Sequence, residues 1–324
     1  MPTNSELLSL CGIELKKESK ASSVLRLFNK EYDSRISKCL YDKLLAAISN
    51  RQPDRLKVPN VTFGVELEFV GSKLPIHLNA FNDAMHYLLG DRYFYAGTYS
   101  HNDGKSWILG RDGSIIYRYS DILYPYGYEL SSPKLSLFNN NDIETLSKVI
   151  EYIKTYLHGE VNLSCGTHVH IGFDNSNSII YRFSILDLLS AYSRMEKTVF
   201  DPIVPSSRRR NRYCHPTKPL LREKYQKLSS RFCEFTYDGE SSILHFEVRQ
   251  LEGTLDLTTI LYWVKLQSCI LHDLLCHIND PCYIDQLSNE NIFDVLLRYD
   301  LDTDLINFFI NRVLEFKSRS IQLS

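Results

Sequence analysis

The residues best suited to chemistry in this sequence are acids and histidines that alternate along short apolar segments. Glu66 and Glu68 stand two apart in VTFGVELEFV, and His168 and His170 stand two apart in NLSCGTHVHIG. Because successive side chains of a strand point to opposite faces, residues two apart share a face. Two ionised glutamates on one buried face would repel each other, so such a pair must face solvent, be protonated, pair with cations or bind metal.

A third alternating segment, SILHFEVRQ, places Glu247 and Arg249 on one face, and two further acids are Asp112 in RDGS and Glu129 in YELSSP. Each feature alone has an ordinary explanation, such as an exposed sheet face, core histidines with partners, or a same-face ion pair. Together they suit a metal-lined sheet face. A donor set rich in carboxylate, with little nitrogen and no sulfur, favours Mg²⁺ or Mn²⁺ over zinc.

A basic loop bounded by prolines is predicted at residues 205–219, PSSRRRNRYCHPTKP. Its arginines can form a solvated charge run, a nucleic-acid patch or a clamp for carboxylate and phosphate groups. Beside a metal-phosphate site the clamp is favoured, because arginine forms forked bonds to oxyanions. The arginines concerned are Arg208, Arg209, Arg210 and Arg212.

The composition indicates a globular protein with no overall attraction to polyanions. The chain has 324 residues, of which 44% are hydrophobic, and its formal net charge is -2. This balance disfavours mechanisms in which the whole molecule is drawn to nucleic acid or to an acidic membrane. Any basic site must therefore be local.

The cysteines and the apolar segments bear on the compartment. None of the eight cysteines forms a CxxC pair, so no zinc ribbon or thioredoxin motif is encoded, and most are expected to be reduced thiols. Glu6 and Glu14 stand where a signal peptide would be apolar. The most apolar long stretch, residues 260–276, contains Lys265 and Asp273 and is too polar for a membrane span. We expect a cytoplasmic protein without a membrane partner.

Hydrophobic periodicity predicts the elements that must position these residues. Strands are expected at 61–70, 161–173 and 242–250, with an antiparallel meander between 95 and 133. Helices are expected at 6–17, 37–49, 76–92, 142–158, 178–200, 256–278, 290–299 and 302–316. We expect Gly159 to end one helix and Asp256 to cap another. The predicted division is an N-terminal helical extension, a catalytic domain and C-terminal helices packed on it, at residues 1–57, 58–280 and 281–324.

Four blocks, FGVELEF, YELSSP, NLSCGTHVHIG and HFEVRQLEGTLD, occur in this order, with RRRNRYCHP between the last two. Together they resemble the putative amidoligase family of carboxylate-amine ligases, relatives of glutamine synthetase and glutamate-cysteine ligase. The resemblance covers roughly residues 60–275. It implies an α+β fold of the glutamine synthetase type: a curved, mostly antiparallel sheet with helices on its convex face, and ATP and metal ions on its concave face.

The resemblance also implies two or three ions of Mg²⁺ or Mn²⁺, held by two groups of residues. The group around the ion that bridges the ATP phosphates is Glu66, His168 and Glu247. The group around the ion nearer the acceptor is Glu68, Asp112 and Glu129. No Walker A motif or Rossmann glycine fingerprint occurs in the chain, so ATP follows only from the resemblance and the metal chemistry.

The remaining implied roles concern the phosphates. His170 would lie near the ATP phosphates or support the metal ligands, and Arg249 would face the transferred phosphate. Two further roles are hypotheses that the resemblance does not supply. The arginines from Arg208 to Arg212, among them Arg209 and Arg210, could hold the substrate carboxylate while covering the site. An acid such as Glu68 or Glu129 could accept the proton of the amine.

The reaction so implied has two steps. A substrate carboxylate attacks the γ-phosphate of ATP and gives an acyl phosphate, which an amine converts into an amide or isopeptide. The donor or acceptor would be an amino acid, peptide, cell-wall fragment or protein side chain, and the relatives leave room for a homo-oligomer. The alternatives are a phosphotransferase of the guanidino-kinase type, a non-catalytic module that keeps the fold, a nucleic-acid binder and a zinc hydrolase. Near-neutral charge disfavours the nucleic-acid binder.

Overall fold

The computed structural model describes most of the chain from residue 56 onward. The described residues are 56–71, 78–89, 94–96, 107–115, 117–119, 122–124, 127–173, 185–209, 214, 216, 232–236 and 244–322. The helices predicted at 6–17 and 37–49 lie outside these ranges.

By contacts between residues the chain divides into two compact units. The first, here called the sheet unit, consists of Pro59–Arg182 and Ser207–Leu271. The second, here called the helical unit, consists of Met1–Val58, Phe183–Ser206 and His272–Ser324. The division predicted at residues 57 and 280 stays a prediction.

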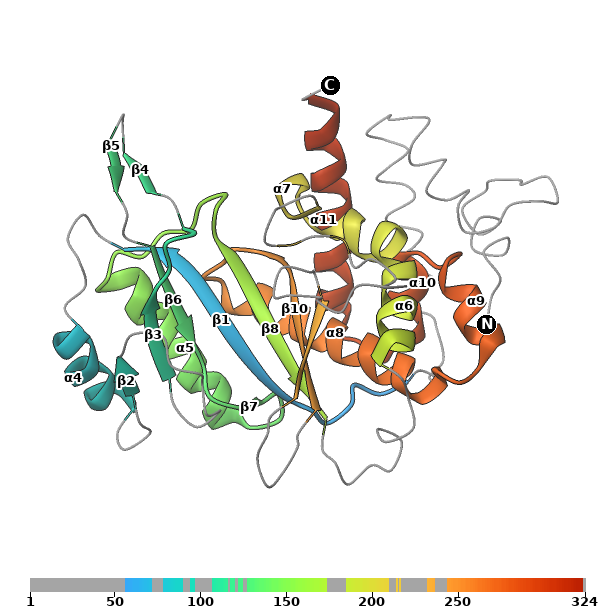
Figure 1. Cartoon of the computed structure of the whole chain (residues 1–324), viewed down its shortest axis with the longest axis horizontal. Coiled ribbons are helices and arrows are strands. Elements are labelled where there is room, and N and C mark those ends of the chain that lie inside the picture. Colours follow the sequence, from blue (N-terminus) through green and yellow to red (C-terminus); the bar gives the residue numbers. More distant parts are fainter. Residues whose placement is uncertain are drawn as a thin grey trace. The chain divides into compact units, whose positions relative to one another are not determined.

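A mostly antiparallel sheet forms the centre of the sheet unit (Figure 1). Its strands are β1 Thr62–Val70, β2 Phe94–Ala96, β3 Trp107–Arg111, β6 Gly127–Ser131, β7 Leu135–Ser136, β8 Gly166–Gly172, β9 Phe232–Thr236 and β10 Leu244–Glu252. Seven strands follow the order β2-β3-β6-β1-β8-β10-β9, and β7 pairs with β1. The strands β4 Tyr117–Tyr119 and β5 Ile122–Tyr124 form a separate two-stranded sheet.

The two faces of the sheet differ in chemistry, as the alternation predicts. On β1, Phe63, Val65 and Leu67 are at most 2% exposed and share one face. Glu66 and Glu68 point to the other face. The apolar face is therefore the one that can drive folding through burial, at roughly 1.5–3 kcal/mol for each large side chain.

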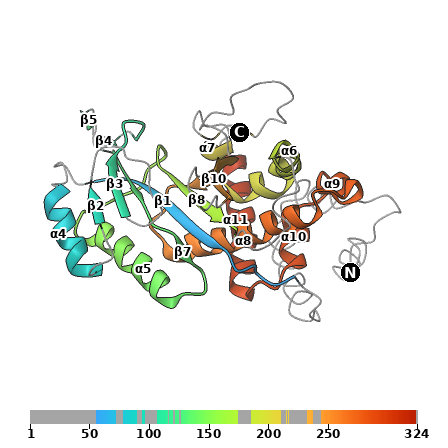
Figure 2. The same ribbon diagram turned by 60° about the horizontal axis from the view of Figure 1, so that its bottom comes forward.

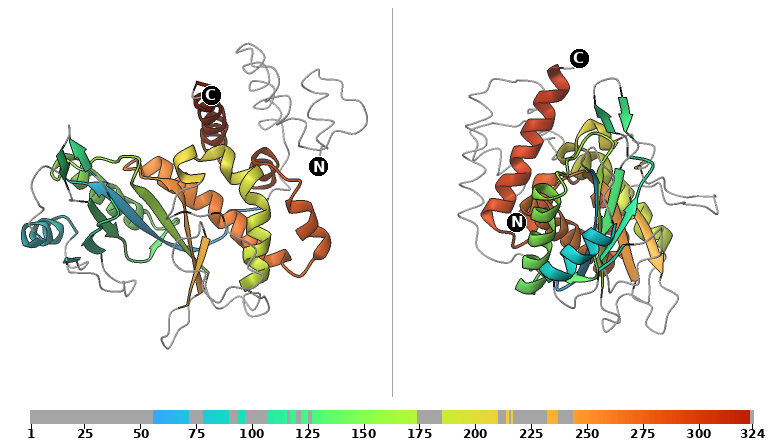
Figure 3. Two further views of the ribbon diagram at one scale, coloured as in Figure 1. Left: turned by 45° about the horizontal axis from the view of Figure 1, so that its top comes forward. Right: turned by 90° about the vertical axis from the view of Figure 1, so that its left-hand side faces the viewer.

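Helices α5, Asn140–Thr155, and α8, Leu257–His277, lie on one side of the sheet (Figures 1 and 3). Helix α4, Leu78–Leu89, lies beside α5 and packs against β2 and α5 (Figure 2). The apolar stripe of α5 is buried as its periodicity predicts, with Leu146 and Val149 fully enclosed. Asp256 caps α8 as expected, because its Oδ2 accepts a hydrogen bond from the Thr259 N–H at 2.8 Å.

The helical unit is built from helices, which range from single turns to the 20 residues of α11. Its elements are α6 Ile185–Met195, the π-helix η2 Glu196–Phe200, the 3₁₀-helix η3 Asp201–Ile203, α9 Pro281–Leu287, α10 Ile292–Arg298 and α11 Thr303–Gln322. Asn291 and Asp294 form a capping box at the start of α10. Helix α9 was not predicted, although Asp280 followed by Pro281 is a helix-start signal.

Four predicted details are wrong. Strand β8 begins at Gly166 rather than at residue 161, because Asn162 first folds a turn: its carbonyl accepts from the Cys165 N–H and its Oδ1 from the Ser164 N–H. The meander is not wholly antiparallel, since β2 and β3 run parallel, and β4 with β5 stands apart. Alternation does not encode strand direction.

The basic segment opens with a short helix, α7 Ser206–Arg209, where a loop was predicted.

The α+β class and the mostly antiparallel sheet are confirmed. Among the described residues, no helix combines the length and the apolar character that crossing a membrane requires.

Candidate metal centre

The register of three neighbouring strands brings distant parts of the chain together. Strand β1 pairs with β8 so that Glu66 lies opposite His168. Strand β10 pairs with the other edge of β8 so that Glu247 lies opposite His170. Residues directly opposite each other on neighbouring strands share a face. The polar residues of the three predicted strand segments therefore line one face of the sheet.

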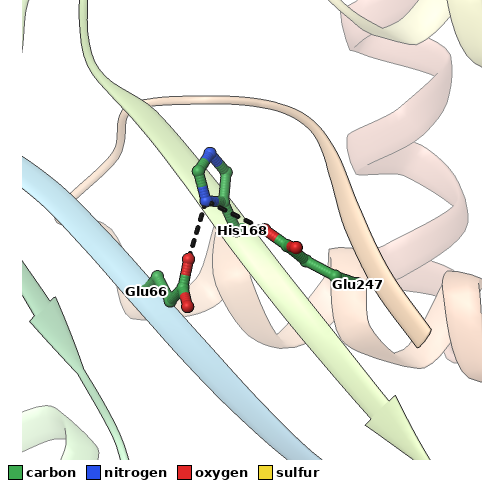
Figure 4. Close-up of side chains that lie close together, drawn as sticks. All are labelled: Glu66, His168 and Glu247. Carbon is green, nitrogen blue, oxygen red and sulfur yellow. Dashed lines mark hydrogen bonds and ion pairs between the residues drawn. The ribbon is translucent and has the colours of Figure 1, made fainter. Parts of the chain in front are cut away.

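His168 is the centre of the first group, which consists of Glu66, His168 and Glu247 (Figure 4). Its Nδ1 lies 2.8 Å from Oε2 of Glu66 and 3.3 Å from Oε1 of Glu247. The side chains of His168 and Glu247 are 4% and 0% exposed. The three ligand atoms lie within 4.8 Å of one another.

The second group shares His168 and consists of Glu68, Glu129 and His168. Glu68 of β1 lies opposite Glu129 of β6. The Nε2 atom of His168 lies 3.3 Å from Oε1 of Glu68, while Oε2 of Glu68 accepts a hydrogen bond from the Gly166 N–H at 2.6 Å. The imidazole of His168 thus stands between the two groups and turns a different nitrogen to each.

Arg249 and His170 complete the polar face. Arg249 contacts both oxygens of the Glu247 carboxylate: Nη2 donates a hydrogen bond to Oε2 at 2.9 Å, and Nε lies 2.6 Å from Oε1 in an ion pair. This fork fixes a permanent positive charge beside the first group. The Nε2 atom of His170 lies 3.1 Å from Oε1 of Glu66.

The charges of the site move the pKa values of its members in opposite directions. Burial acts to raise the pKa of Glu66, but His170 and His168 outweigh it and hold that pKa well below its usual range. Burial acts to lower the pKa of His170, and the Glu66 carboxylate outweighs it and raises that pKa. Burial, followed by the charges of Glu66, Glu68, Asp112 and Glu247, raises the pKa of Glu129 well above its usual range. At Glu129, therefore, the positive groups of the site do not offset burial and the neighbouring negative charges.

The donor set fits a hard divalent cation. Within the described residues, the Glu129 carboxylate accepts no hydrogen bond and forms no ion pair, although it faces four other acids. Each group offers two carboxylates and one imidazole, and neither includes a sulfur ligand. Such a set suits Mg²⁺ or Mn²⁺, and a cation there would supply the charge that Glu129 lacks.

The residues around these ligands explain two of the sequence blocks. In YELSSP, the Ser132 hydroxyl accepts from the Val65 N–H at 2.9 Å, and the Ser132 N–H donates to the Val65 carbonyl at 2.8 Å. These bonds tie the end of β6 to β1 beside Glu66. In the last block, a Cβ on Gly253 would lie 2.4 Å from Cβ of Cys165, so only glycine fits where the end of β10 crosses the turn before β8.

Cys165 stands next to the second group but is not a nucleophile. It is 1% exposed, and burial raises the pKa of its thiol to about 11. The thiol is therefore neutral near pH 7, and the block NLSCG has a structural role.

The structure brings together most of the predicted site residues. Glu66, Glu68, Glu129, His168, His170, Glu247 and Arg249 all lie on the polar face of the sheet. Asp112 lies in neither group, because its Oδ1 accepts from the Ser114 N–H at 2.7 Å in a turn, although its charge acts on Glu129. Arg209 lies on α7, and Arg210 and Arg212 lie outside the described residues.

The part played by Arg208 was not predicted. The sequence groups Arg208 with a solvated or ligand-clamping loop, but this residue is 2% exposed and donates to the carbonyl of Arg249. A run of arginines carries no signal that one member is buried.

Comparison with known proteins agrees with this geometry. The family profile described as putative amidoligase enzyme matches residues 59–236. The match covers β1, β6 and β8, and thus Glu66, Glu68, Glu129, His168 and His170. No curated protein matches the chain significantly. The profile extends over more than half of the 324 residues, and the chain therefore belongs to the putative amidoligase family.

Proposed function

We propose that this protein is an ATP-dependent carboxylate-amine ligase that forms an amide or isopeptide bond through an acyl phosphate. Membership of the amidoligase family implies carboxylate and amine substrates. The observation that carries the proposal is the pair of carboxylate-imidazole groups that share His168 on one sheet face. Neutralising a triphosphate is the task for which a ligase needs two such cation sites.

The residues of the two groups would hold two Mg²⁺ or Mn²⁺ ions, and the family's chemistry leaves room for a third. Bound there, the ions would screen the negative charge of the ATP phosphates and of the phosphate being transferred. Because His168 has one nitrogen near each group, its imidazole sets the distance between the two positions. Asp112 is proposed as an outer member that adds charge without touching the ion nearer the acceptor.

Arg249 and His170 would act on the phosphates. Glu247 holds the Arg249 guanidinium by one hydrogen bond and a close ion pair, so its charge is fixed before the substrate arrives. His170 carries a raised pKa through Glu66, which favours its charged form beside an anion. We place the transferred phosphate near these two residues.

The proposed reaction balances as follows. A carboxylate oxygen of the donor attacks the γ-phosphorus of ATP, the bond to the β,γ-bridging oxygen breaks, and ADP leaves. The amine nitrogen of the acceptor then attacks the acyl carbon, inorganic phosphate leaves with the C–O bonding pair, and the amine releases a proton. Water would divert the acyl phosphate, so the site needs a cover. Arg209, Arg210 and Arg212 are proposed to provide it while holding the substrate carboxylate.

The finer fold and the setting of the enzyme are part of this proposal. We infer that the sheet is curved as in glutamine synthetase, with α5 and α8 on its convex face and the acids on its concave face. The substrates are proposed to be an amino acid, a peptide or a protein, and a homo-oligomer fits the relatives. The need for ATP agrees with a cytoplasmic location, which stays a prediction.

The test is an ATP turnover assay with Mg²⁺ or Mn²⁺ against pairs of carboxylates and amines. The expected result is ADP release that depends on both substrates, with a product whose mass equals their sum less one water. Glu66→Gln and Glu247→Gln should each lower turnover at least ~100-fold. Glu144→Gln, which changes an exposed acid on α5, is the matched control and should keep wild-type turnover.

Three outcomes would contradict the proposal. ADP release with a phosphorylated product and no requirement for amine would indicate a phosphotransferase. Nucleotide binding without turnover would indicate a non-catalytic module. Full turnover of Glu66→Gln and Glu247→Gln would show that the chemistry takes place elsewhere.

A further inference from the structure

Arg208 is a buried cation beside the strands that carry the polar face. It lies on α7, is 2% exposed, and its Nη2 donates to the carbonyl of Arg249 on β10. Arg249 is the residue whose guanidinium holds Glu247. Arg208 therefore contacts the backbone of the strand at the residue that fixes the first group.

The same guanidinium lies against the start of β8. A Cβ on Gly166 would lie 2.7 Å from Nη2 and 3.0 Å from Cζ of Arg208, so only a glycine lets it approach. The Gly166 N–H donates to Oε2 of Glu68 in the second group. One side chain thus touches two strands at the two residues that anchor Glu247 and Glu68.

Arg208 is poorly compensated for a buried charge. Within the described residues, no carboxylate forms an ion pair with it, and its buried Nε donates no hydrogen bond. Burying a cation without a paired anion costs free energy, whereas an apolar side chain of similar volume would pack there at less cost. Stability alone does not account for an arginine at this position.

We propose that Arg208 is a positioning residue that sets the relative placement of the two metal groups, through the Arg249 carbonyl on one side and Gly166 on the other. The inference rests on the metal-holding role proposed above. The planar guanidinium of Arg208 can bond the Arg249 carbonyl and lie against Gly166 at the same time. The ammonium group of a lysine cannot do both. Its charge also offsets part of the excess negative charge of the site.

The experiment measures Mn²⁺ binding to the 324-residue chain without nucleotide or substrate, by titration calorimetry and by the paramagnetic resonance signal of free Mn²⁺. The variants are Arg208→Met, which keeps length but removes the charge and donors, and Arg208→Lys, which keeps the charge. Arg208→Met should weaken Mn²⁺ binding about 10-fold, as expected when a residue that orients a metal ligand is lost. Arg208→Lys should restore only part of the affinity.

Gly166→Ala supplies an independent variant, because its methyl group would displace the Arg208 guanidinium while keeping the arginine. It should weaken Mn²⁺ binding to a similar degree. The double variant Gly166→Ala with Arg208→Met should be no weaker than either single variant, because both break one arrangement. Additive losses would contradict the proposal.

Arg312→Met is the matched control. Arg312 is also buried, at 7% exposed, and its Nε donates to a backbone carbonyl, that of Ile203, but both residues belong to the helical unit. It should lower the unfolding midpoint and leave Mn²⁺ affinity unchanged. Unchanged Mn²⁺ affinity in Arg208→Lys and Gly166→Ala would overturn the role of Arg208 and leave the proposed metal groups untouched. Absence of Mn²⁺ binding by the wild-type protein would overturn the metal groups, and both proposals with them.

Discussion

Glu129 in the sheet unit and Asp273 in the helical unit are acids among other ionisable groups, but their surroundings are opposite. Asp273 is 3% exposed, and its Oδ2 accepts from the Tyr283 hydroxyl at 2.7 Å, Arg298 Nη1 at 2.7 Å and the Tyr299 hydroxyl at 3.0 Å. Glu129, within the described residues, has no donor and faces other acids.

The Asp273 cluster, defined as Asp273, His277, Tyr283, Arg298 and Tyr299, is complete with the protein's own groups. Nδ1 of His277 lies 3.1 Å from the second carboxylate oxygen of Asp273. Such a fully bonded buried network rigidifies the packing around it. Its side-chain hydrogen bonds join α8, α9 and α10.

The candidate metal centre is incomplete by the same standard. Within the described residues, the side chains that pair with its four glutamates are one arginine and two histidines. A buried polar network that is only partly satisfied costs stability. The difference favours a ligand-binding role for the acids of the sheet unit and a structural role for Asp273 in the helical unit.

The largest effect is expected from breaking the complete cluster. Asp273→Asn removes the charged acceptor of Tyr283, Tyr299 and Arg298, although Arg298 keeps its ion pair with Glu290, and should lower the free energy of unfolding by about 3 kcal/mol. Denaturation followed by circular dichroism measures the change. Asp285→Asn is the control, because Asp285 is 80% exposed and pairs with Arg194 at the surface, and it should change little. A stable Asp273→Asn protein would show that the cluster is not structural.

Period-two alternation was enough to predict which residues share a face, but not which strands are neighbours. The spacing of Glu66 and Glu68, or of His168 and His170, predicts a common side because strand geometry is local. That Glu66 lies opposite His168, 102 residues later, depends on the register between β1 and β8. The residue types together suggested one metal-lined face, and the resemblance to the amidoligase family suggested which residues share an ion.

Features that depend on tertiary packing were out of reach. The burial of Arg208 against Gly166 depends on a contact between α7 and β8 that no local pattern encodes. The turn at Asn162 and the helix at Pro281 are different, because Asn in a turn and Asp-Pro at a helix start are local signals. The sequence carried both signals, but a strand was predicted across Asn162 and no helix was predicted at Pro281.

Smaller effects are expected from adding Mn²⁺ to the candidate metal centre and from removing one of its negative charges. Mn²⁺ at 100 times its dissociation constant should stabilise the wild-type protein by about 2.7 kcal/mol. In chelator, Glu129→Gln should raise the free energy of unfolding by about 1 kcal/mol, because it removes one of several like charges. Tryptophan fluorescence is the readout, because Trp107 and Trp263, the only two tryptophans, are buried in the sheet unit.

The same variants cross-check the comparison. Glu129→Gln should lose part of the stabilisation by Mn²⁺, whereas Asp273→Asn should keep all of it. Destabilisation of the chelated protein by Glu129→Gln would mean that the Glu129 carboxylate already has a partner that stabilises the fold. The contrast with Asp273 would then fail.

A third effect concerns one hydroxyl of the complete cluster. Tyr283→Phe removes a donor to Asp273 and should cost about 1.5 kcal/mol near pH 7. Burial, followed by the Asp273 carboxylate, raises the pKa of Tyr283, so the folded protein keeps this proton above pH ~10, where the unfolded chain loses it. Wild-type stability should therefore fall as the pH rises past that point, more steeply than that of Tyr283→Phe, and the difference between them should shrink. Tyr87→Phe, at a position 90% exposed on α4, is the control and should follow the wild type at every pH. Equal stability of Tyr283→Phe and wild type at pH 7 would mean that the hydrogen bond from Tyr283 to Asp273 does not stabilise the fold. Asp273 would then no longer serve as the fully bonded acid of the comparison.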